Sequence, residues 1–82
     1  MFAWSNDRRF DVMCYLILIE PTETGFSAYS PDLPGCVSTG RTAAEVEANM
    51  REAVEGHLEE MRSAGLPIPK PTTAAGYVEV AA

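Results

Sequence analysis

The carboxylates are the side chains of this sequence that would have to carry any hydrolytic chemistry. Asp32 lies between two prolines in the segment PDLPG, and Glu20 ends an apolar run that begins at Met13. A metal-dependent nuclease needs several carboxylates that converge on Mg²⁺. Here Asp32 fits a turn residue, Glu45 fits a helix cap, and the first strand holds only Glu20 at its far end. We interpret the chain as a non-enzyme without a metal or cofactor, with a residual metal-dependent nuclease as an alternative.

One histidine and two cysteines are the other candidates for chemistry. His57 falls among apolar residues at helical spacing and has no nearby Ser or Cys nucleophile in the sequence pattern, so we interpret it as a residue at the edge of the core. Cys14 and Cys36 are far apart, whereas a zinc site needs three or four well-spaced ligands. We interpret both cysteines as small buried side chains in a reducing compartment.

The charge balance restricts the kinds of partner. The 82 residues include 12 acidic and 6 basic side chains, for a net charge of −6. Binding to nucleic acid rests on concentrated Lys and Arg, so this composition argues against a phosphate-binding domain. A basic protein partner and simple solubility both explain the acidity. No apolar run approaches the ~20 residues that span a bilayer, and we expect a cytoplasmic protein without membrane contact.

The stretch from Thr42 to Gly65 has the pattern of one amphipathic helix with a signal at each end. Thr42 can cap the amide of Glu45 while the Glu45 carboxylate reaches back to Thr42. Gly65 can adopt the left-handed turn that follows a helix, with Leu66 folding back on Met61. Apolar residues recur at spacings of three and four and so share one face: Val46, Met50, Ala53, Val54, His57, Leu58 and Met61.

Four short segments have the pattern of β-strands. Residues 13–20 are apolar at odd and even positions alike, which indicates a strand in the middle of a sheet. Two further segments follow the turns at Pro21–Gly25 and Pro31–Gly35, and this closeness predicts an antiparallel meander. The four predicted strands are residues 13–20, 26–30, 36–39 and 77–80.

These elements predict an α+β domain in two layers with the order β-β-β-α-β, over residues 13–82, after a poorly ordered leader at residues 1–12. The helix returns the chain so that the last strand runs parallel to the first, which gives a four-stranded mixed sheet of order 3-2-1-4. One helix covers one face of this sheet, and the other face needs a layer from another chain. That face carries either Tyr15, Ile17 and Ile19 or Cys14, Leu16 and Leu18.

The connector between the second and third predicted strands, together with the start of the helix, resembles a known family. The motif YSPDLPGC at residues 29–36 is followed at set spacings by Gly40, Thr42, Glu45, Asn49 and the pair Glu52–Ala53. In this combination the chain resembles the HicB family of antitoxins from bacterial toxin–antitoxin pairs, from Met13 to about Lys70. The family's core resembles a degraded, truncated ribonuclease H-type fold, in agreement with the predicted order of elements.

The resemblance implies a non-catalytic protein that binds a small basic ribonuclease toxin of the HicA type and masks its active surface. Many family members carry a C-terminal DNA-binding segment, whereas two residues follow Val80 here, so we expect a short form without direct DNA binding. The uncovered sheet face predicts a homo-oligomer, either a dimer or a tetramer. The alternative is an orphan HicB-like module that self-assembles without a toxin.

The candidate residues for binding the toxin or a second copy come from a sheet face and from a helix face, and the sequence leaves open which of them makes the contact. The sheet contributes apolar and aromatic side chains, which supply affinity when they are buried. The helix contributes a carboxylate cluster, which is either a solvated face or a contact for lysines of the toxin. The candidate residues are Tyr15, Leu16, Ile17, Leu18, Tyr29, Glu55, Glu59 and Glu60.

Overall fold

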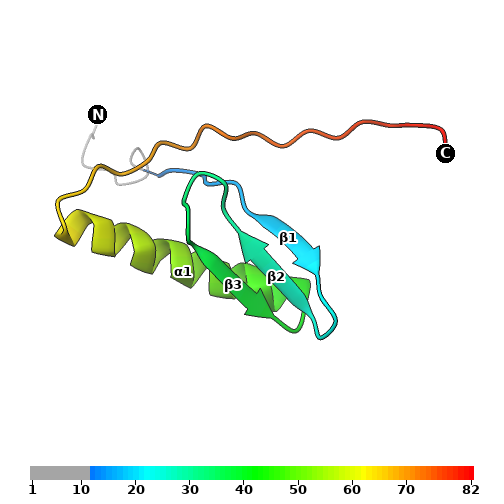
Figure 1. The fold of residues 1–82 in the computed structure, drawn as a ribbon, viewed down its shortest axis with the longest axis horizontal. Coiled ribbons are helices and arrows are strands. Elements are labelled where there is room, and N and C mark those ends of the chain that lie inside the picture. Colours follow the sequence, from blue (N-terminus) through cyan, green and yellow to red (C-terminus); the bar gives the residue numbers. More distant parts are fainter. Residues whose placement is uncertain (1–11) are drawn as a thin grey trace, which may run out of the picture.

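A computed structural model describes residues 12–82 and shows an α+β arrangement of one helix against one face of an antiparallel sheet (Figure 1). This class and this layering are as predicted. Residues 1–11, most of the predicted leader, lie outside the described residues. The sheet has the strand order β1-β2-β3, and the elements are β1 (Leu18–Pro21), β2 (Phe26–Tyr29), β3 (Val37–Gly40) and α1 (Ala43–Ser63).

The N-terminus of α1 is capped almost as predicted. The amide of Glu45 donates a hydrogen bond to Thr42 Oγ1 at 3.0 Å. The Glu45 carboxylate accepts from the amide of Arg41, one residue before the predicted donor. One turn further on, the side-chain amide of Asn49 donates to the carbonyl of Thr39 at 2.9 Å and joins the helix to the end of β3. These bonds satisfy groups that a bare helix start would leave without partners.

The C-terminus of α1 has the predicted Schellman ending. Gly65 has a φ of 74°, a conformation that glycine adopts at little cost. The amide of Leu66 donates to the carbonyl of Met61 at 2.9 Å, and the amide of Gly65 donates to the carbonyl of Arg62 at 3.1 Å. The helix is therefore bounded at both ends by local signals, and its length is set independently of the sheet.

The core lies between β2, the β2–β3 connector and the first half of α1. Within the connector, the amide of Leu33 donates to the carbonyl of Ser30 at 3.1 Å, and this turn directs Leu33 inward, where it is fully buried. Ser30 is a buried polar residue, and its hydroxyl donates to the carbonyl of Leu16 at 2.8 Å. The buried apolar residues are Ala28, Leu33, Cys36, Val46 and Met50.

The first turn of α1 approaches β3 at Gly40. A Cβ atom at this position would lie 2.6 Å from the backbone nitrogen of Val46 and 2.9 Å from its Cα. These are backbone atoms, which cannot move aside as a flexible side chain can. The absence of a side chain at Gly40 therefore allows the close packing of α1 on the sheet, and Val46 becomes fully buried there.

The strand register decides which face of the sheet is left open. Leu18 pairs with Tyr29, and Tyr29 pairs with Val37, so these three side chains lie in one row. The neighbouring residue Ala28 is buried in the core on the α1 side. The row therefore lies on the face away from α1. Of the two sets considered from the sequence, Leu18 lies on the face away from the helix and Ile19 on the α1 side. Cys14, of the same set as Leu18, instead lines a groove against α1, because residues 12–17 lie outside the strand.

The predicted fourth strand does not form in the described part of the chain. Tyr77–Val80 is extended but pairs with no strand, so the sheet has three strands and β1 lies at its edge rather than in its centre. The order 3-2-1-4 is therefore not seen. β1 also begins at Leu18 rather than at residue 13, because the chain turns into the connector soon after Tyr29 and leaves no strand beside residues 13–17.

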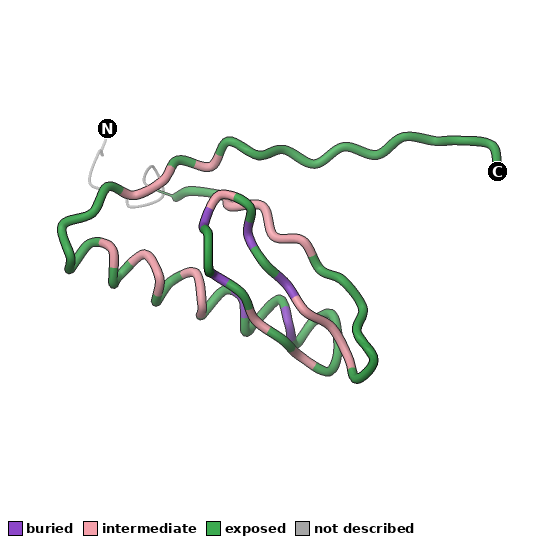
Figure 2. Tube along the Cα trace, in the orientation of Figure 1, coloured by how far each residue is buried: buried purple, intermediate pink, exposed green. Residues whose placement is uncertain are grey.

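The chain after α1 forms an extended segment that first lies along the domain and then continues beyond it (Figure 1). Three prolines at residues 67–71 stiffen its start and remove backbone donors. The carboxylate of Asp32 then accepts four hydrogen bonds of 2.8–3.1 Å from the amides and hydroxyls of Thr72 and Thr73. From Thr72 onward every residue is exposed, as Figure 2 shows. Asp32 thus anchors a distant segment rather than capping its own turn.

Candidate interaction surfaces

The carboxylates of residues 12–82 do not converge on one point. Asp32 is occupied by Thr72 and Thr73, and Glu45 caps α1. The hydrogen bonds from Thr73 lower the pKa of Asp32 most; desolvation opposes this shift, and the bonds from Thr72 add to it. Within residues 12–82, no group of three or more His, Cys, Asp or Glu side chains is placed to hold a metal ion. The arrangement gives no support to a metal-dependent nuclease.

The cysteines and His57 have different surroundings. Cys36 is buried in the core as predicted, and this burial raises the pKa of its thiol. Cys14 is exposed, so the prediction that it is buried was wrong; it lies before β1, where no strand covers it. His57 is half-buried on α1, which agrees with the predicted place at the edge of the core.

The first candidate surface is the face of the sheet opposite α1, called the open sheet face below. Its centre is the row of Leu18, Tyr29 and Val37, in which Tyr29 is 39% exposed and Val37 is 64% exposed. Ser27 and Thr39 pair next to this row and give it a polar border. Apolar and aromatic side chains within a polar rim are typical of a protein–protein interface.

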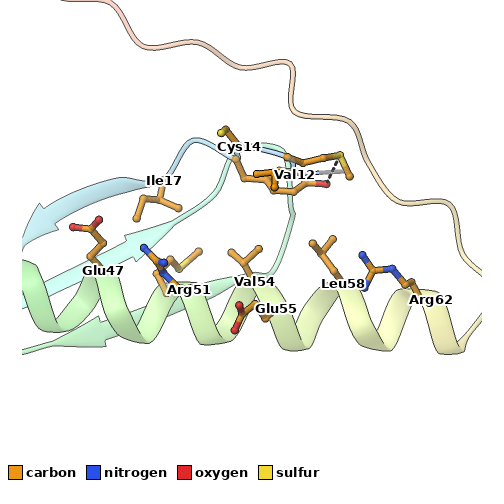
Figure 3. A pocket seen from close by; sticks show the side chains of 12 residues that line it. Val12, Cys14, Ile17, Glu47, Arg51, Val54, Glu55, Leu58 and Arg62 are labelled. Atoms are coloured by element: carbon orange, nitrogen blue, oxygen red, sulfur yellow. Dashed lines mark hydrogen bonds between the residues drawn. The ribbon is translucent and has the colours of Figure 1, made fainter. Parts of the chain in front are cut away.

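The second candidate surface is a groove of about 590 Å³ between residues 12–17 and α1, called the α1 groove below (Figure 3). In Figure 3, Val54 and Leu58 point from α1 toward the segment that leads into β1. The apolar lining comes from Tyr15, Ile17, Met50, Val54 and Leu58, and the charged lining from Glu47, Arg51, Glu55 and Arg62. On the sheet side, the groove is lined by the segment that leads into β1, and β1 is an edge strand among the described residues.

Tyr15 lines this groove and also contacts the segment after α1. Its hydroxyl donates a hydrogen bond to the carbonyl of Pro69, which ties the segment before β1 to the segment after α1. Burial raises the pKa of Tyr15, and the positive charge of Arg62 opposes this rise. The two chain segments that flank the helical layer are thus held together at this point.

The third candidate surface is the outer side of α1. Glu59 and Glu60 are exposed there, and the Glu59 carboxylate lies 3.7 Å from the guanidinium of Arg62. Such an exposed pair one turn apart adds little stability. Glu55 is also exposed but contributes to the α1 groove instead.

The structure therefore divides seven of the eight predicted residues among three surfaces. Leu18 and Tyr29 belong to the open sheet face, whereas Tyr15, Ile17 and Glu55 line the α1 groove and Glu59 and Glu60 lie on the outer side of α1. Leu16 is half-buried before β1, where its carbonyl accepts the hydrogen bond from Ser30. The sequence did not identify Val37 as a surface residue, although the period of two along β3 would place it beside Tyr29. It also assigned Val54 and Leu58 to the apolar side of the helix without showing that a groove lies over them.

The match to known proteins agrees with this geometry. Residues 15–81 match the model of a family described as "HicB_like antitoxin of bacterial toxin-antitoxin system". The chain belongs to this family. The matched range begins in the segment before β1 and includes the sheet, α1 and the extended segment after it.

Several relatives of this HicB-like chain are similar over most of its length. A 14.9 kDa protein of Haemophilus phage HP1 is 36% identical over 66 residues, which cover 80% of this chain and 50% of the phage protein. A UPF0150 protein of Thermoplasma acidophilum is 32% identical over 59 residues, covering 71% of this chain and 86% of the relative. The chain thus spans half the length of the phage relative but most of the length of the archaeal one.

Two solved structures share the fold of this HicB-like chain. A chain in a HicA3 and HicB3 toxin–antitoxin complex is 38% identical, with a TM-score of 0.64 over 73% of this chain and 70% of that one. A HicB3 antitoxin structure is also 38% identical, with a TM-score of 0.63 over 73% of this chain and 44% of that one. The family and these neighbours are antitoxins, so the interpretation as a non-enzyme is confirmed. Across residues 12–82, no helix combines the length and apolar character needed to cross a membrane.

Proposed function

We propose that this HicB-like protein is an antitoxin that binds a HicA-like ribonuclease toxin and covers the active surface of that toxin. The observation that carries the proposal is its likeness, at 38% identity and a TM-score of 0.64, to a chain of a HicA3 and HicB3 toxin–antitoxin complex. The family model, which spans residues 15–81, supports the same function.

The open sheet face is the surface that we assign to the toxin. Leu18, Tyr29 and Val37 provide a continuous apolar row with an aromatic anchor at its centre, and α1 occupies the opposite side of the sheet. A buried aromatic residue surrounded by smaller contacts is the usual source of most binding energy at a protein interface. Burial of this row against the toxin would supply the affinity and exclude RNA from the covered surface.

The acidic composition favours a basic partner. The net charge of −6 would attract a basic toxin over distance and orient it before contact. Such steering acts mainly on the association rate. Raising the salt concentration to ~0.5 M should therefore slow association strongly and change dissociation less, because the screening length falls to a few Å.

The proposal predicts that a neighbouring reading frame encodes a HicA-like toxin, called the adjacent toxin below, and co-expression with it is the test. The wild-type protein should restore growth and co-purify with the toxin. Tyr29→Arg combined with Val37→Arg should abolish both effects, because two positive charges would face a basic partner across the open sheet face. Glu52→Arg is the matched control, since Glu52 is exposed on α1, in the other layer, and its replacement should leave rescue intact.

A triple charge reversal at Glu55, Glu59 and Glu60 separates the two possible contact faces. If the triple variant loses rescue while the Tyr29/Val37 variant keeps it, the toxin binds α1 and not the open sheet face. If the wild-type protein neither rescues growth nor co-purifies with the adjacent toxin, the antitoxin function itself is wrong.

A self-assembling module without a toxin is the second candidate. The exposed segment after Thr73 favours it, because apolar side chains at Tyr77, Val78 and Val80 lie open to solvent. Pull-downs from cells that contain the adjacent toxin would return only the protein itself if this candidate is correct. The lack of direct DNA binding remains a prediction that rests on the acidic composition and is checked by a binding titration with the operator region.

A further inference from the structure

The segment from Ala74 to Ala82, called the C-terminal arm below, has the pattern of a β-strand without a sheet. Its centre is Tyr77-Val78-Glu79-Val80, in which Val78 and Val80 share one face. Tyr77 is 97% exposed, Val78 87% and Val80 78%. β-Branched and aromatic residues in extended backbone favour sheet formation, and exposed apolar side chains of this kind favour burial.

The outer edge of β1 is a place where such a strand could pair. Among residues 12–82, β1 pairs with β2 on one side only, so no described strand satisfies the backbone groups on its other side. The α1 groove lies beside residues 12–17, which lead into this edge, and Ile17, Val54 and Leu58 give it an apolar lining. Ile19 of β1 is also 37% exposed on the α1 side of the sheet. A strand added here would meet both unpaired backbone and apolar side chains.

The arm does not pair with the outer edge of β1 in its own chain. The bonds from Thr72 and Thr73 to Asp32 anchor the segment at the β2–β3 connector, and the prolines at residues 67–71 keep it extended up to that point. Beyond the anchor the arm projects away from the domain, as Figure 1 shows. The anchor thus presents the arm to solvent rather than to the edge of its own sheet.

We infer that the C-terminal arm of one copy adds as a fourth strand to the β1 edge of a second copy, and that the exchange is reciprocal. This inference goes beyond the proposed antitoxin function and leaves the open sheet face free for the toxin. A twofold dimer follows, because each copy offers one arm and one edge. Residues 74–82 are long enough to run along residues 13–21 of the edge.

The side chains of the arm fit this site. With Val78 and Val80 turned toward α1, their methyl groups would cover Val54 and Leu58, while Tyr77 would extend the open sheet face beside Leu18. Residues 13–17 would gain a neighbouring strand. This explains why their apolar pattern predicts a strand although β1 of the isolated chain begins only at Leu18.

Light scattering after size exclusion tests the exchange on the full chain without toxin, from 1 to 200 µM. The wild type should have twice the protomer mass of 8.9 kDa, and Val78→Asp combined with Val80→Asp should have the protomer mass, because the added carboxylates cannot enter the apolar groove. Ala74→Asp combined with Ala82→Asp is the matched control, since it adds the same charge to the arm outside its central strand and should leave the dimer intact. Both pairs are exposed in the protomer, so its fold should be unaffected.

A mixing experiment identifies the exchanged parts. Leu58→Glu should block the groove and give a monomer. The Leu58→Glu variant keeps its arm, and the Val78/Val80 variant keeps its groove. A mixture of the two variants should therefore form a heterodimer, although neither variant dimerises alone. Amide hydrogen exchange gives a readout that requires no variant: the amides of Tyr77–Val80 should exchange at least ~100-fold more slowly in the dimer than in an unstructured peptide.

Four results would overturn the exchange. They are a wild-type monomer throughout the concentration range, a dimer that survives the Val78/Val80 change, unprotected arm amides in a dimer, and protected arm amides in a monomer. The last result would show that the arm pairs with β1 of its own chain. None of these results bears on toxin binding, which the co-expression experiment measures separately.

Discussion

The two halves of α1 carry similar apolar residues but have different surroundings. In the first half, Val46 and Met50 are fully buried against Ala28, Leu33 and the rest of the core. In the second half, Val54 and Leu58 are only half-buried and line the α1 groove. One apolar side of a helix thus serves two purposes: the first half holds the protomer together, and the second half is available to another polypeptide.

Met50→Ala should have the largest effect on stability, because Met50 is fully buried in the first half of α1. Removing a fully buried side chain loses its transfer free energy and leaves a cavity, so the free energy of unfolding should fall by about 3 kcal/mol. Urea denaturation followed by circular dichroism measures this. A loss below ~1 kcal/mol would show that the first half of α1 is no better packed than the second.

Leu58→Ala should cost about 1 kcal/mol in the protomer, since its side chain already contacts solvent. The same substitution should weaken dimerisation if the C-terminal arm of a second copy covers the groove. Denaturation at low and high protein concentration separates the two effects. Equal losses for Leu58→Ala and Met50→Ala at low concentration would remove the distinction between the halves.

Thr42→Ala should cost on the order of 1 kcal/mol, from the lost hydrogen bond between Thr42 Oγ1 and the amide of Glu45. Thr42→Ser keeps the acceptor oxygen and serves as the control. An unchanged denaturation midpoint in Thr42→Ala would show that the buried half of α1 does not depend on its cap.

Acidification should release the segment at Thr72 and Thr73, with the smallest effect on overall stability. The pKa of Asp32 is lowered in the folded state, so its hydrogen bonds persist above the ordinary pKa of 3.8 and are lost as pH falls through the lowered value. An NMR pH titration of the Thr72 and Thr73 amides should therefore show a midpoint below 3.8. Asp32→Asn should remove that transition, and a midpoint at or above 3.8 would contradict the anchor.

Local signals explain what the sequence could predict about the fold. The cap at Thr42, the Schellman ending at Gly65 and the apolar side of α1 depend on residues within one or two turns of each other, and all three appear in the structure. The sequence left two alternatives for the side chains on the open face of the sheet. Alternation along a strand separates the side chains of residues 13–20 into two sets but does not say which set packs against the helix. The register of Leu18 with Tyr29 decides between them.

Long-range partners explain what the sequence could not predict. The link from Asp32 to Thr72 and Thr73 spans about forty residues and has no motif of its own. The strand pattern at Tyr77–Val80 was recognised, but its pairing with β1 of the same chain is not confirmed, because the bonds of Thr72 and Thr73 to Asp32 direct the segment away from that edge. Which candidate residues share a surface could not be predicted either, because that depends on how α1 lies against residues 12–17. Tyr15, Ile17 and Glu55 line one groove there.

Inhibition of a purified HicA-like toxin tests the proposed function most directly. RNA cleavage by the adjacent toxin should fall to zero when the wild-type protein reaches one equivalent, and it should persist with the Tyr29→Arg/Val37→Arg variant at the same concentration. The proposed function would be contradicted by full cleavage in the presence of an excess of folded wild-type protein.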